Sequence, residues 1–149
     1  MQVNIKQPET VAVIPCYNEQ QTIKTVVSKA FQYVPSVIVV DDGSLDQTGE
    51  EARLAGALVL THPYNQGKGA AIRTAFLYLR TMGCKAAVFL DGDGQHDPAE
   101  IPRVLTPVLA GKADMVIGSR FIEGSYRIPL YRRMGQTVLN VITYVGSQV

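Results

Sequence analysis

Two aspartates separated by one glycine, Asp91 and Asp93, are the residues of this sequence best suited to bind a metal ion. Carboxylates at this spacing in a turn relaxed by glycine can reach one hard cation, and Gln95 adds a neutral carbonyl oxygen. Oxygen ligands indicate Mg²⁺ or Mn²⁺, which keeps positions open for substrate phosphates when few protein groups hold it. The alternative is an acidic turn that caps a helix beginning at Pro98, a role that Asp97 alone would fill.

A second pair of carboxylates, Asp41 and Asp42, follows another apolar run. Adjacent side chains of a strand point to opposite sides, so the two aspartates should have different roles. Asp42 is suited to cap a turn through Gly43 and Ser44, whereas Asp41 is suited to accept a hydrogen bond from a nucleobase N–H.

Lys68 stands between Gly67 and Gly69 at the expected start of a helix. Glycines beside a lysine at a helix N-terminus suit a contact with a phosphate group. A tight turn with a solvated lysine explains the same pattern equally well. The segment is not a P-loop, because the first glycine and the final Ser/Thr of that motif are absent.

The cysteines and histidines do not form a catalytic or zinc-binding pattern. Cys16 and Cys84 are too few and too far apart for a disulfide framework. Cys16 is interpreted as a packing residue, since no histidine and acid accompany it. His62 and His96 are interpreted as structural residues or as supports for neighbouring site residues.

The apolar pattern predicts short strands that alternate with helices. Strands are expected at Val11–Ile14, Val37–Val40, Ala57–Leu60, Ala86–Leu90 and Met115–Ile117. Helices are expected at Ile23–Phe31, Thr48–Ala55, Ala70–Leu79 and Pro98–Leu109. The inner face of the third helix is expected to consist of Ala71, Ala75, Phe76 and Leu79.

This alternation predicts an α/β fold with a doubly wound, mainly parallel sheet that is covered on both faces. Ligands bind such sheets beyond the carboxyl ends of the strands. Acidic, amide and aromatic side chains follow the predicted strands there. The site should therefore lie at this edge of the sheet.

Composition limits the classes of function. The chain has 149 residues, of which 46% are apolar and 18% are charged, as in a folded domain. Its 14 basic and 13 acidic residues give a net charge of +1, which argues against a general nucleic-acid binder. The N-terminus lacks a signal-peptide pattern, and no apolar run reaches the ~18 residues of a membrane span. We expect a reduced, cytoplasmic protein with one domain over residues 1–149, a tail at 1–10 and a last helix at about 132–146.

The segment from Arg120 to Arg133 is basic, with four arginines and one glutamate. The segment from Asp91 to Glu100 holds four acidic residues and no basic residue. Such opposed regions suit a substrate that has a metal-bound diphosphate and a second anionic group. A solvated basic loop is the alternative.

Several motifs in order resemble those of family 2 glycosyltransferases of the GT-A fold, from Val11 to the end of the chain. The motifs are VIPCYNE, VVDDGSLDQT, NQGKGAAIRTAF, FLDGDGQHDP and VIGSRF. With YRRMG added, the chain is most similar to the dolichyl- or polyprenyl-phosphate mannosyl- and glucosyltransferase branch. This branch transfers a sugar from a nucleotide sugar, linked to UDP or GDP, to a lipid phosphate with inversion.

The resemblance implies roles for the matching residues. The nucleotide site would be lined by Pro15, Tyr17, Asn18 and Glu19. The base and ribose would contact Asp41 and Asp42, and Lys68 would join the substrate-binding residues. The metal–diphosphate site would consist of Asp91, Asp93 and Gln95. Donor or acceptor phosphates would be held by Arg120, Arg132 and Arg133. Catalysis would depend on Asp93 and Arg120.

A divalent ion on Asp93 and Gln95 would neutralise the charge that builds on the leaving diphosphate. A phosphate acceptor is already an anionic nucleophile, so a protein base is unnecessary. A lipid acceptor implies contact with the cytoplasmic face of a membrane. An uncharged helical stripe would then face the lipid, with a core helix as the alternative; it comprises Val138, Leu139, Val141, Ile142 and Val145.

The chain departs from the family in three respects. Ala75 replaces a frequent glycine, and Thr137 replaces a serine near the paired arginines. Family members also continue with an acceptor side, so we expect the donor half here and a truncated acceptor half. Two alternatives follow: a truncated, non-catalytic nucleotide-sugar-binding domain, and a sugar-phosphate nucleotidyltransferase. The lack of a glycine-rich basic loop after the first strand counts against the latter.

Overall fold

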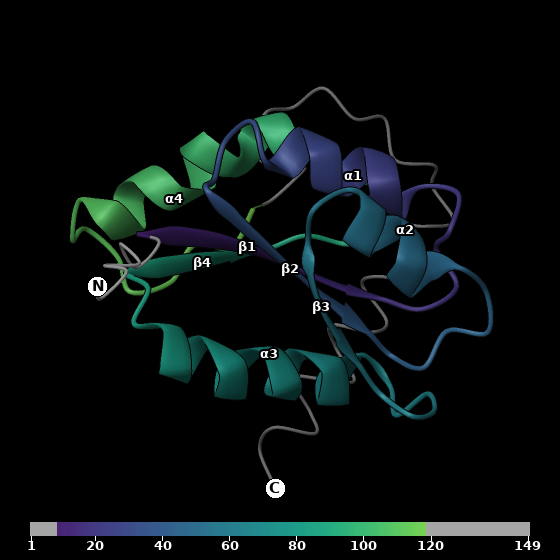
Figure 1. The fold of residues 1–149 in the computed structure, drawn as a ribbon. Helices are drawn as coiled ribbons and strands as arrows, with labels where there is room; N and C mark the ends of the chain where they lie inside the picture. Colours follow the sequence, from purple (N-terminus) through teal and green to yellow (C-terminus); the bar gives the residue numbers. More distant parts are fainter. Residues whose placement is uncertain (1–8, 119–149) are drawn as a thin grey trace, which may run out of the picture. The chain divides into compact units, whose positions relative to one another are not determined.

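A computed structural model describes residues 9–118, in which helices cover both faces of a parallel sheet (Figure 1). The strands are β1 (Thr10–Cys16), β2 (Ser36–Asp41), β3 (Leu58–Thr61) and β4 (Ala86–Phe89). The helices are α1 (Ile23–Ala30), α2 (Thr48–Leu54), α3 (Lys68–Met82), the 3-10 turn η1 (Pro98–Glu100) and α4 (Ile101–Leu109). Nearly all of these residues belong to one compact unit of the chain, Met1–Val116.

The strand order explains where a ligand site can form. The order is β3-β2-β1-β4, and each neighbouring pair is parallel. The chain builds outward from β1 to β3 and then returns past β1 to form β4. The direction of winding therefore reverses between β1 and β4, as in a doubly wound sheet. The predicted α/β fold with a mainly parallel sheet is confirmed.

Both faces of β1 are buried, which explains its nearly continuous apolar sequence. Ala12 and Ile14 belong to the core shared with α1, α2 and α4. Val11 and Val13 belong to the core shared with α3. Figure 1 shows these two layers, with α3 as the one described helix below the sheet in this view. The alternation of successive side chains lets one strand serve both cores.

The described part of the chain contains four strands, and the prediction of a fifth at Met115–Ile117 is wrong. No strand forms there, and the side chains of Met115 and Ile117 are 75% and 77% exposed. A run of three apolar residues is at the lower limit of strand length. Within residues 9–118 it has no pairing partner, so its apolar character alone does not bury it.

The helix predicted at Ala70–Leu79 is longer, and one of its inner residues was assigned wrongly. Gly67 precedes α3 with a φ of 91°, and Gly83 ends it in the left-handed conformation at 65°. Three of the four predicted inner residues are buried, but Phe76 is 54% exposed. It lies one position after Ala75 and is thus rotated by ~100° from the buried stripe. Its ring contacts Phe89, with centroids 5.2 Å apart.

The helix predicted from Pro98 begins as η1 and continues as α4. Asp97 caps this start, because its carboxylate accepts a hydrogen bond from the Ala99 N–H at 3.0 Å. Asp97 alone therefore caps this helix start.

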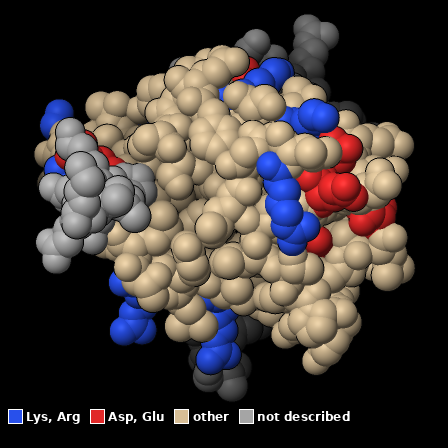
Figure 2. Space-filling view, viewed as in Figure 1, with Lys and Arg blue, Asp and Glu red and all other residues tan. Residues whose placement is uncertain are grey.

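Charges of both signs lie side by side on the surface in Figure 2. Glu50 and Glu51 lie in the first turn of α2, and Arg53 lies in its last. Glu51 forms an ion pair with Lys24 of α1 at 3.2 Å. The net charge of +1 therefore conceals neighbouring acidic and basic groups.

The burial of Ile38 and Phe76 predicts an order of stability losses opposite to the order expected from side-chain size alone. Ile38 in β2 is fully buried, whereas the larger Phe76 is half exposed. Ile38→Ala should lower the free energy of unfolding by about 2–5 kcal/mol. Phe76→Ala should lower it by less, roughly 1 kcal/mol, since less of its surface is buried. Urea unfolding followed by circular dichroism measures both values, and a larger loss for Phe76→Ala would contradict this packing.

Candidate functional site

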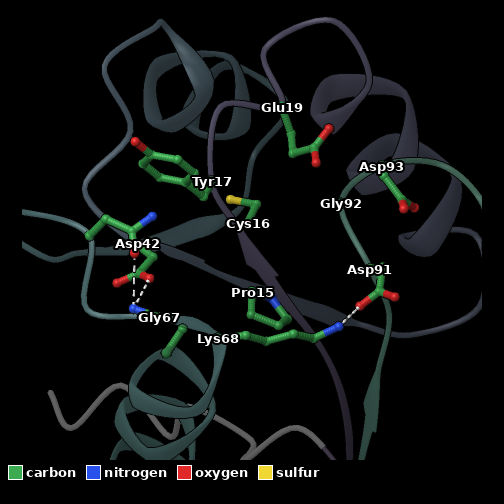
Figure 3. Close-up of a pocket in the computed structure, with 12 residues that line it drawn as sticks. Pro15, Cys16, Tyr17, Glu19, Asp42, Gly67, Lys68, Asp91, Gly92 and Asp93 are labelled. Atoms are coloured by element: carbon green, nitrogen blue, oxygen red, sulfur yellow. Dashed lines mark hydrogen bonds and ion pairs between the residues drawn. The ribbon is translucent and has the colours of Figure 1, made fainter. Parts of the chain in front are cut away.

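A pocket of about 240 Å³ opens beyond the carboxyl ends of the strands, at the point where the winding reverses (Figure 3). Its walls come from the end of β1, from the loops after β1, β2, β3 and β4, and from the start of α3. The lining residues are Pro15, Cys16, Tyr17, Glu19, Asp42, Asn65, Gly67, Lys68, Ala71, Asp91, Gly92 and Asp93. Seven of them are predicted site residues, so the structure gathers most of the candidates that it describes.

Pro15 helps to open the pocket between β1 and β4. The C=O of Val13 accepts a hydrogen bond from the Leu90 N–H at 2.9 Å. Alternate residues of a strand face the same neighbour, so Pro15 is the next position of β1 that faces β4. Proline has no N–H to donate, and the pairing of β1 with β4 ends at Val13. β1 continues beside β2 alone, which leaves a crevice on the β4 side.

The Asp42 carboxylate ties the end of β2 to the loop before α3. One oxygen, Oδ1, accepts a hydrogen bond from the Gln66 N–H at 3.0 Å and lies 2.6 Å from Nδ1 of His62. The other, Oδ2, accepts a hydrogen bond from the Gly67 N–H at 2.7 Å. The other ring nitrogen of His62 lies 2.8 Å from the Thr74 hydroxyl. His62 therefore supports a site residue, as the sequence indicates.

These contacts keep the buried carboxyl group charged. Burial acts to raise the pKa of Asp42, but the N–H groups of Gln66 and Gly67 and the His62 ring outweigh it. The net result is a pKa below the usual value. A deprotonated Asp42 thus fixes the backbone that precedes Lys68.

The prediction that Asp42 caps the turn after β2 is wrong. Asp41, not Asp42, caps it, because its Oδ1 accepts a hydrogen bond from the Ser44 N–H at 3.0 Å. Its side chain is buried, and a Cβ at Gly49 would lie 2.6 Å from its Oδ2. Of the two aspartates, only Asp42 lines the pocket. Alternation along the strand fixed opposite directions for them but not which one faced the pocket.

Asn18 does not line the pocket but joins the loop after β1 to the loop after β2. Its N–H donates to the Ser44 hydroxyl at 2.9 Å, and its side-chain oxygen accepts from the Leu45 N–H at 2.8 Å. Asn18 has a φ of 56°, a left-handed conformation that asparagine tolerates better than most residues. This turn lets Tyr17 and Glu19, on either side, line the pocket.

Asp46 and Thr48 make a second connection between these loops. The Thr48 hydroxyl donates to Asp46 and accepts from the Glu19 N–H at 2.7 Å. Burial acts to raise the pKa of Asp46, but hydrogen bonds from Thr48 and Gln20 outweigh it and leave the pKa below its usual value. Sequence reasoning missed both residues. Their signal is an aspartate two residues before a threonine at a helix start, which is a capping pattern.

Lys68 reaches across the pocket to Asp91. The ammonium nitrogen lies 2.5 Å from Oδ1 of Asp91, and Figure 3 shows the extended side chain between α3 and the end of β4. The two side chains are 62% and 33% exposed. His96 accepts a hydrogen bond from the Asp91 N–H at 3.1 Å and so supports this loop.

Asp93 lines the pocket, and its Oδ1 accepts a hydrogen bond from the Gln95 N–H at 2.8 Å. Gln95 itself is exposed and is not among the lining residues. Within residues 9–118, no group of three or more His, Cys, Asp and Glu side chains is arranged to hold a metal ion. Two carboxylates, Asp91 and Asp93, do face one pocket, and Mg²⁺ or Mn²⁺ needs only one or two when substrate phosphates supply the rest. The donor set therefore fits a divalent ion shared with a ligand.

Cys16 packs against the loop after β4 and is not a nucleophile. Burial, supported by nearby carboxylates such as Asp41 and Glu19, raises the pKa of its thiol far above the usual range. A Cβ at Gly92 would lie 2.9 Å from the Cβ of Cys16, so only glycine allows this close approach. Gly92 thereby places Asp91 and Asp93 beside β1.

The pocket also contains residues that were not predicted, and some predicted residues lie outside the described range. Asn65 and Ala71 line the pocket although the sequence analysis did not predict them as site residues. Asn65 stands in the motif NQGKGAAIRTAF. Three predicted arginines and the helix at about 132–146 lie outside the described residues; the arginines are Arg120, Arg132 and Arg133.

The model of the glycosyl transferase family 2 matches residues 11–145, and the chain belongs to this family. It is 38% identical to a polyprenol monophosphomannose synthase of Mycolicibacterium smegmatis over 77% of this chain and 46% of that protein. It is 31% identical to a UDP-N-acetylglucosamine–dolichyl-phosphate N-acetylglucosaminyltransferase of Methanococcus voltae over 89% of this chain and 61% of that protein. The chain thus spans about half to three fifths of the length of these relatives.

The fold also matches a solved structure of a glucosyl-3-phosphoglycerate synthase from Mycobacterium tuberculosis, bound to Mn²⁺, UDP-glucose and phosphoglyceric acid. The TM-score is 0.59 at 29% identity, over 70% of this chain and 40% of that chain. These findings confirm the predicted family and GT-A-type fold, and they disfavour the nucleotidyltransferase alternative.

Asp42→Asn should destabilise the protein in a pH-dependent way. The amide can no longer accept both backbone N–H bonds, so the free energy of unfolding should fall by about 1–3 kcal/mol at pH 7. Because the pKa of Asp42 is lowered by folding, its contribution is complete above the unfolded pKa of about 3.9 and disappears as the pH falls through the folded value. The difference from wild type should therefore shrink below about pH 4.

Urea unfolding between pH 3 and pH 7 measures this difference. The control is Asp114→Asn at an exposed aspartate, which should change stability by less than ~0.5 kcal/mol. A difference that stays constant down to pH 3 would show that the Asp42 charge does not hold the loop.

Proposed function

We propose that this chain provides the donor side of a metal-dependent glycosyltransferase. The reaction transfers a sugar from a UDP- or GDP-linked nucleotide sugar to a polyprenyl or dolichyl phosphate, with inversion. The observation that carries this proposal is the pocket at the reversal of the sheet, in which Lys68 pairs with Asp91, and Asp93 also lines the wall. The activities for which these relatives are named support the donor and acceptor classes.

The diphosphate of the donor would bind near the start of α3. The first turn of this 15-residue helix presents N–H groups and the positive end of the helix dipole. Lys68 adds a full positive charge at the same place. Asp42 fixes Gly67 and thereby aims both features at the pocket. Tyr17 and Asp42, on the β2 side of Asp91, would contact the nucleoside.

Asp91 and Asp93 would hold Mg²⁺ or Mn²⁺ together with the diphosphate oxygens. Bound there, the ion neutralises the charge that develops on the leaving nucleoside diphosphate. Asp93 is the better placed of the two carboxylates, because Lys68 already neutralises Asp91. The solved structure with Mn²⁺ and UDP-glucose supports this choice of ion and donor.

A phosphate acceptor removes the need for a general base. Its oxygen is anionic at neutral pH and attacks the sugar carbon directly, on the face opposite the leaving group. Arg120, Arg132 and Arg133, outside the described residues, are proposed to hold phosphate groups. Within residues 9–118, no helix has the length and apolar character to cross a membrane. Contact with the cytoplasmic face of a membrane through the lipid acceptor is part of this proposal.

Calorimetric titration with UDP- and GDP-sugars tests donor binding. Mn²⁺ should strengthen binding of the preferred nucleotide, and Asp93→Ala should remove most of that gain. Loss of a charge-assisted contact predicts about a tenfold effect. Glu100→Ala, at an exposed acidic residue of η1, is the matched control and should bind like wild type. Binding that ignores both the metal and Asp93→Ala would refute the metal-dependent site.

Transfer is tested separately with a labelled nucleotide sugar and polyprenyl phosphate. The transferase predicts a labelled lipid with an inverted anomeric configuration. Donor binding without labelled lipid would support the alternative of a non-catalytic nucleotide-sugar-binding domain.

A further inference from the structure

The pocket has an excess of negative charge that an anionic ligand must overcome. Among the described lining residues, four are acidic and Lys68 is the one basic residue. Asp42 is already held by backbone N–H groups and His62. The exposed part of the rim thus carries three carboxylates, those of Glu19, Asp91 and Asp93, and one ammonium, that of Lys68. A diphosphate can enter only where cations compensate these carboxylates.

Lys68 supplies that compensation to Asp91 in the structure. Its ammonium lies 2.5 Å from Oδ1 of Asp91. The same carboxylate would be a ligand of a divalent ion held by Asp91 and Asp93. An ammonium and a divalent ion repel each other strongly at such distances, so both cannot occupy that position.

The ion pair is built to break easily. With side chains 62% and 33% exposed, it resembles surface pairs, which contribute little because water screens them. The Lys68 side chain is a flexible four-carbon stem. Its backbone follows Gly67, whose N–H is held by Asp42. The ammonium can therefore move while its anchor stays fixed at the start of α3.

We infer that Lys68 and a divalent ion exchange places on Asp91. Without donor, Lys68 neutralises Asp91; when donor and ion bind together, the ammonium turns to the diphosphate and releases the carboxylate. Lys68 is thus a positioning residue that keeps Asp91 from binding metal ions alone and couples metal binding to donor binding. This inference rests on the proposed function only for the identity of the donor.

The first test measures Mn²⁺ binding to the 149-residue chain without nucleotide, from the free-ion signal in electron paramagnetic resonance. Lys68→Gln should bind Mn²⁺ about three- to tenfold more tightly than wild type, because the competing charge is gone. Lys68→Arg should restore the wild-type affinity. Lys85→Gln is the matched control, since Lys85 is a similarly exposed lysine that forms an ion pair outside the pocket, with Glu9 at 2.7 Å. A merely structural lysine would not produce a gain of affinity on removal.

A double-variant cycle assigns the effect to Asp91. In an Asp91→Asn background, Lys68→Gln should leave Mn²⁺ affinity unchanged. Equal Mn²⁺ affinity of wild type and Lys68→Gln would overturn the inference, as would a gain that persists without Asp91.

The second test measures UDP and GDP binding with and without Mn²⁺. Lys68→Gln should weaken nucleotide binding, and the ratio of affinities with and without Mn²⁺ should change by about three- to tenfold relative to wild type. An unchanged ratio would overturn the coupling. If wild type binds neither nucleotide, the proposed function fails, while the Mn²⁺ measurement still decides whether Lys68 competes for Asp91.

Discussion

The hydrogen bonds accepted by the Asp42 carboxylate are the constraint on which the site depends. They join the end of a central strand to the loop that begins α3, across 25 residues of sequence. The carboxyl group remains charged when buried, and its bonds to the N–H groups of Gln66 and Gly67 hold the loop in position. That position sets the start of the helix and the reach of Lys68. Connections through Asn18 and Thr48 then fix the β1 loop against the β2 loop.

The rest of the rim follows from packing against this frame. Pro15 ends the pairing of β1 with β4, and Gly92 lets the β4 loop approach Cys16 closely. The result gathers two carboxylates and one lysine around one pocket at the reversal of the sheet. A hydrogen-bonded frame with an exposed ammonium suits a site that must accept both a cation and a diphosphate. Membership in the glycosyl transferase family 2 agrees with this arrangement.

The sequence predicted correctly those features that follow from local apolar patterns and from the parallel topology. Apolar runs identified four strands and their helices, and parallel topology placed the strand-end residues together. The sequence predictions failed where the direction of a side chain or the pairing of a strand depends on residues that are distant in the sequence. Alternation could not decide whether Asp41 or Asp42 faced the pocket, and periodicity placed Phe76 inside although its helix turns it outward. The apolar run at Met115–Ile117 found no partner among the described residues. The bonds of Thr48 join distant loops, which no local pattern reveals.

Residue-resolved NMR titration with UDP and GDP tests the central claim most directly, that the rim around Lys68 and Asp91 binds a nucleoside diphosphate. In the presence of Mg²⁺, amide shifts should concentrate at Gly67, Lys68 and Gly92 and should reach saturation. The chemical shifts of amides at the C-terminal end of α4 should not change. Shifts that avoid the pocket, or that never saturate at millimolar nucleotide, would contradict the account.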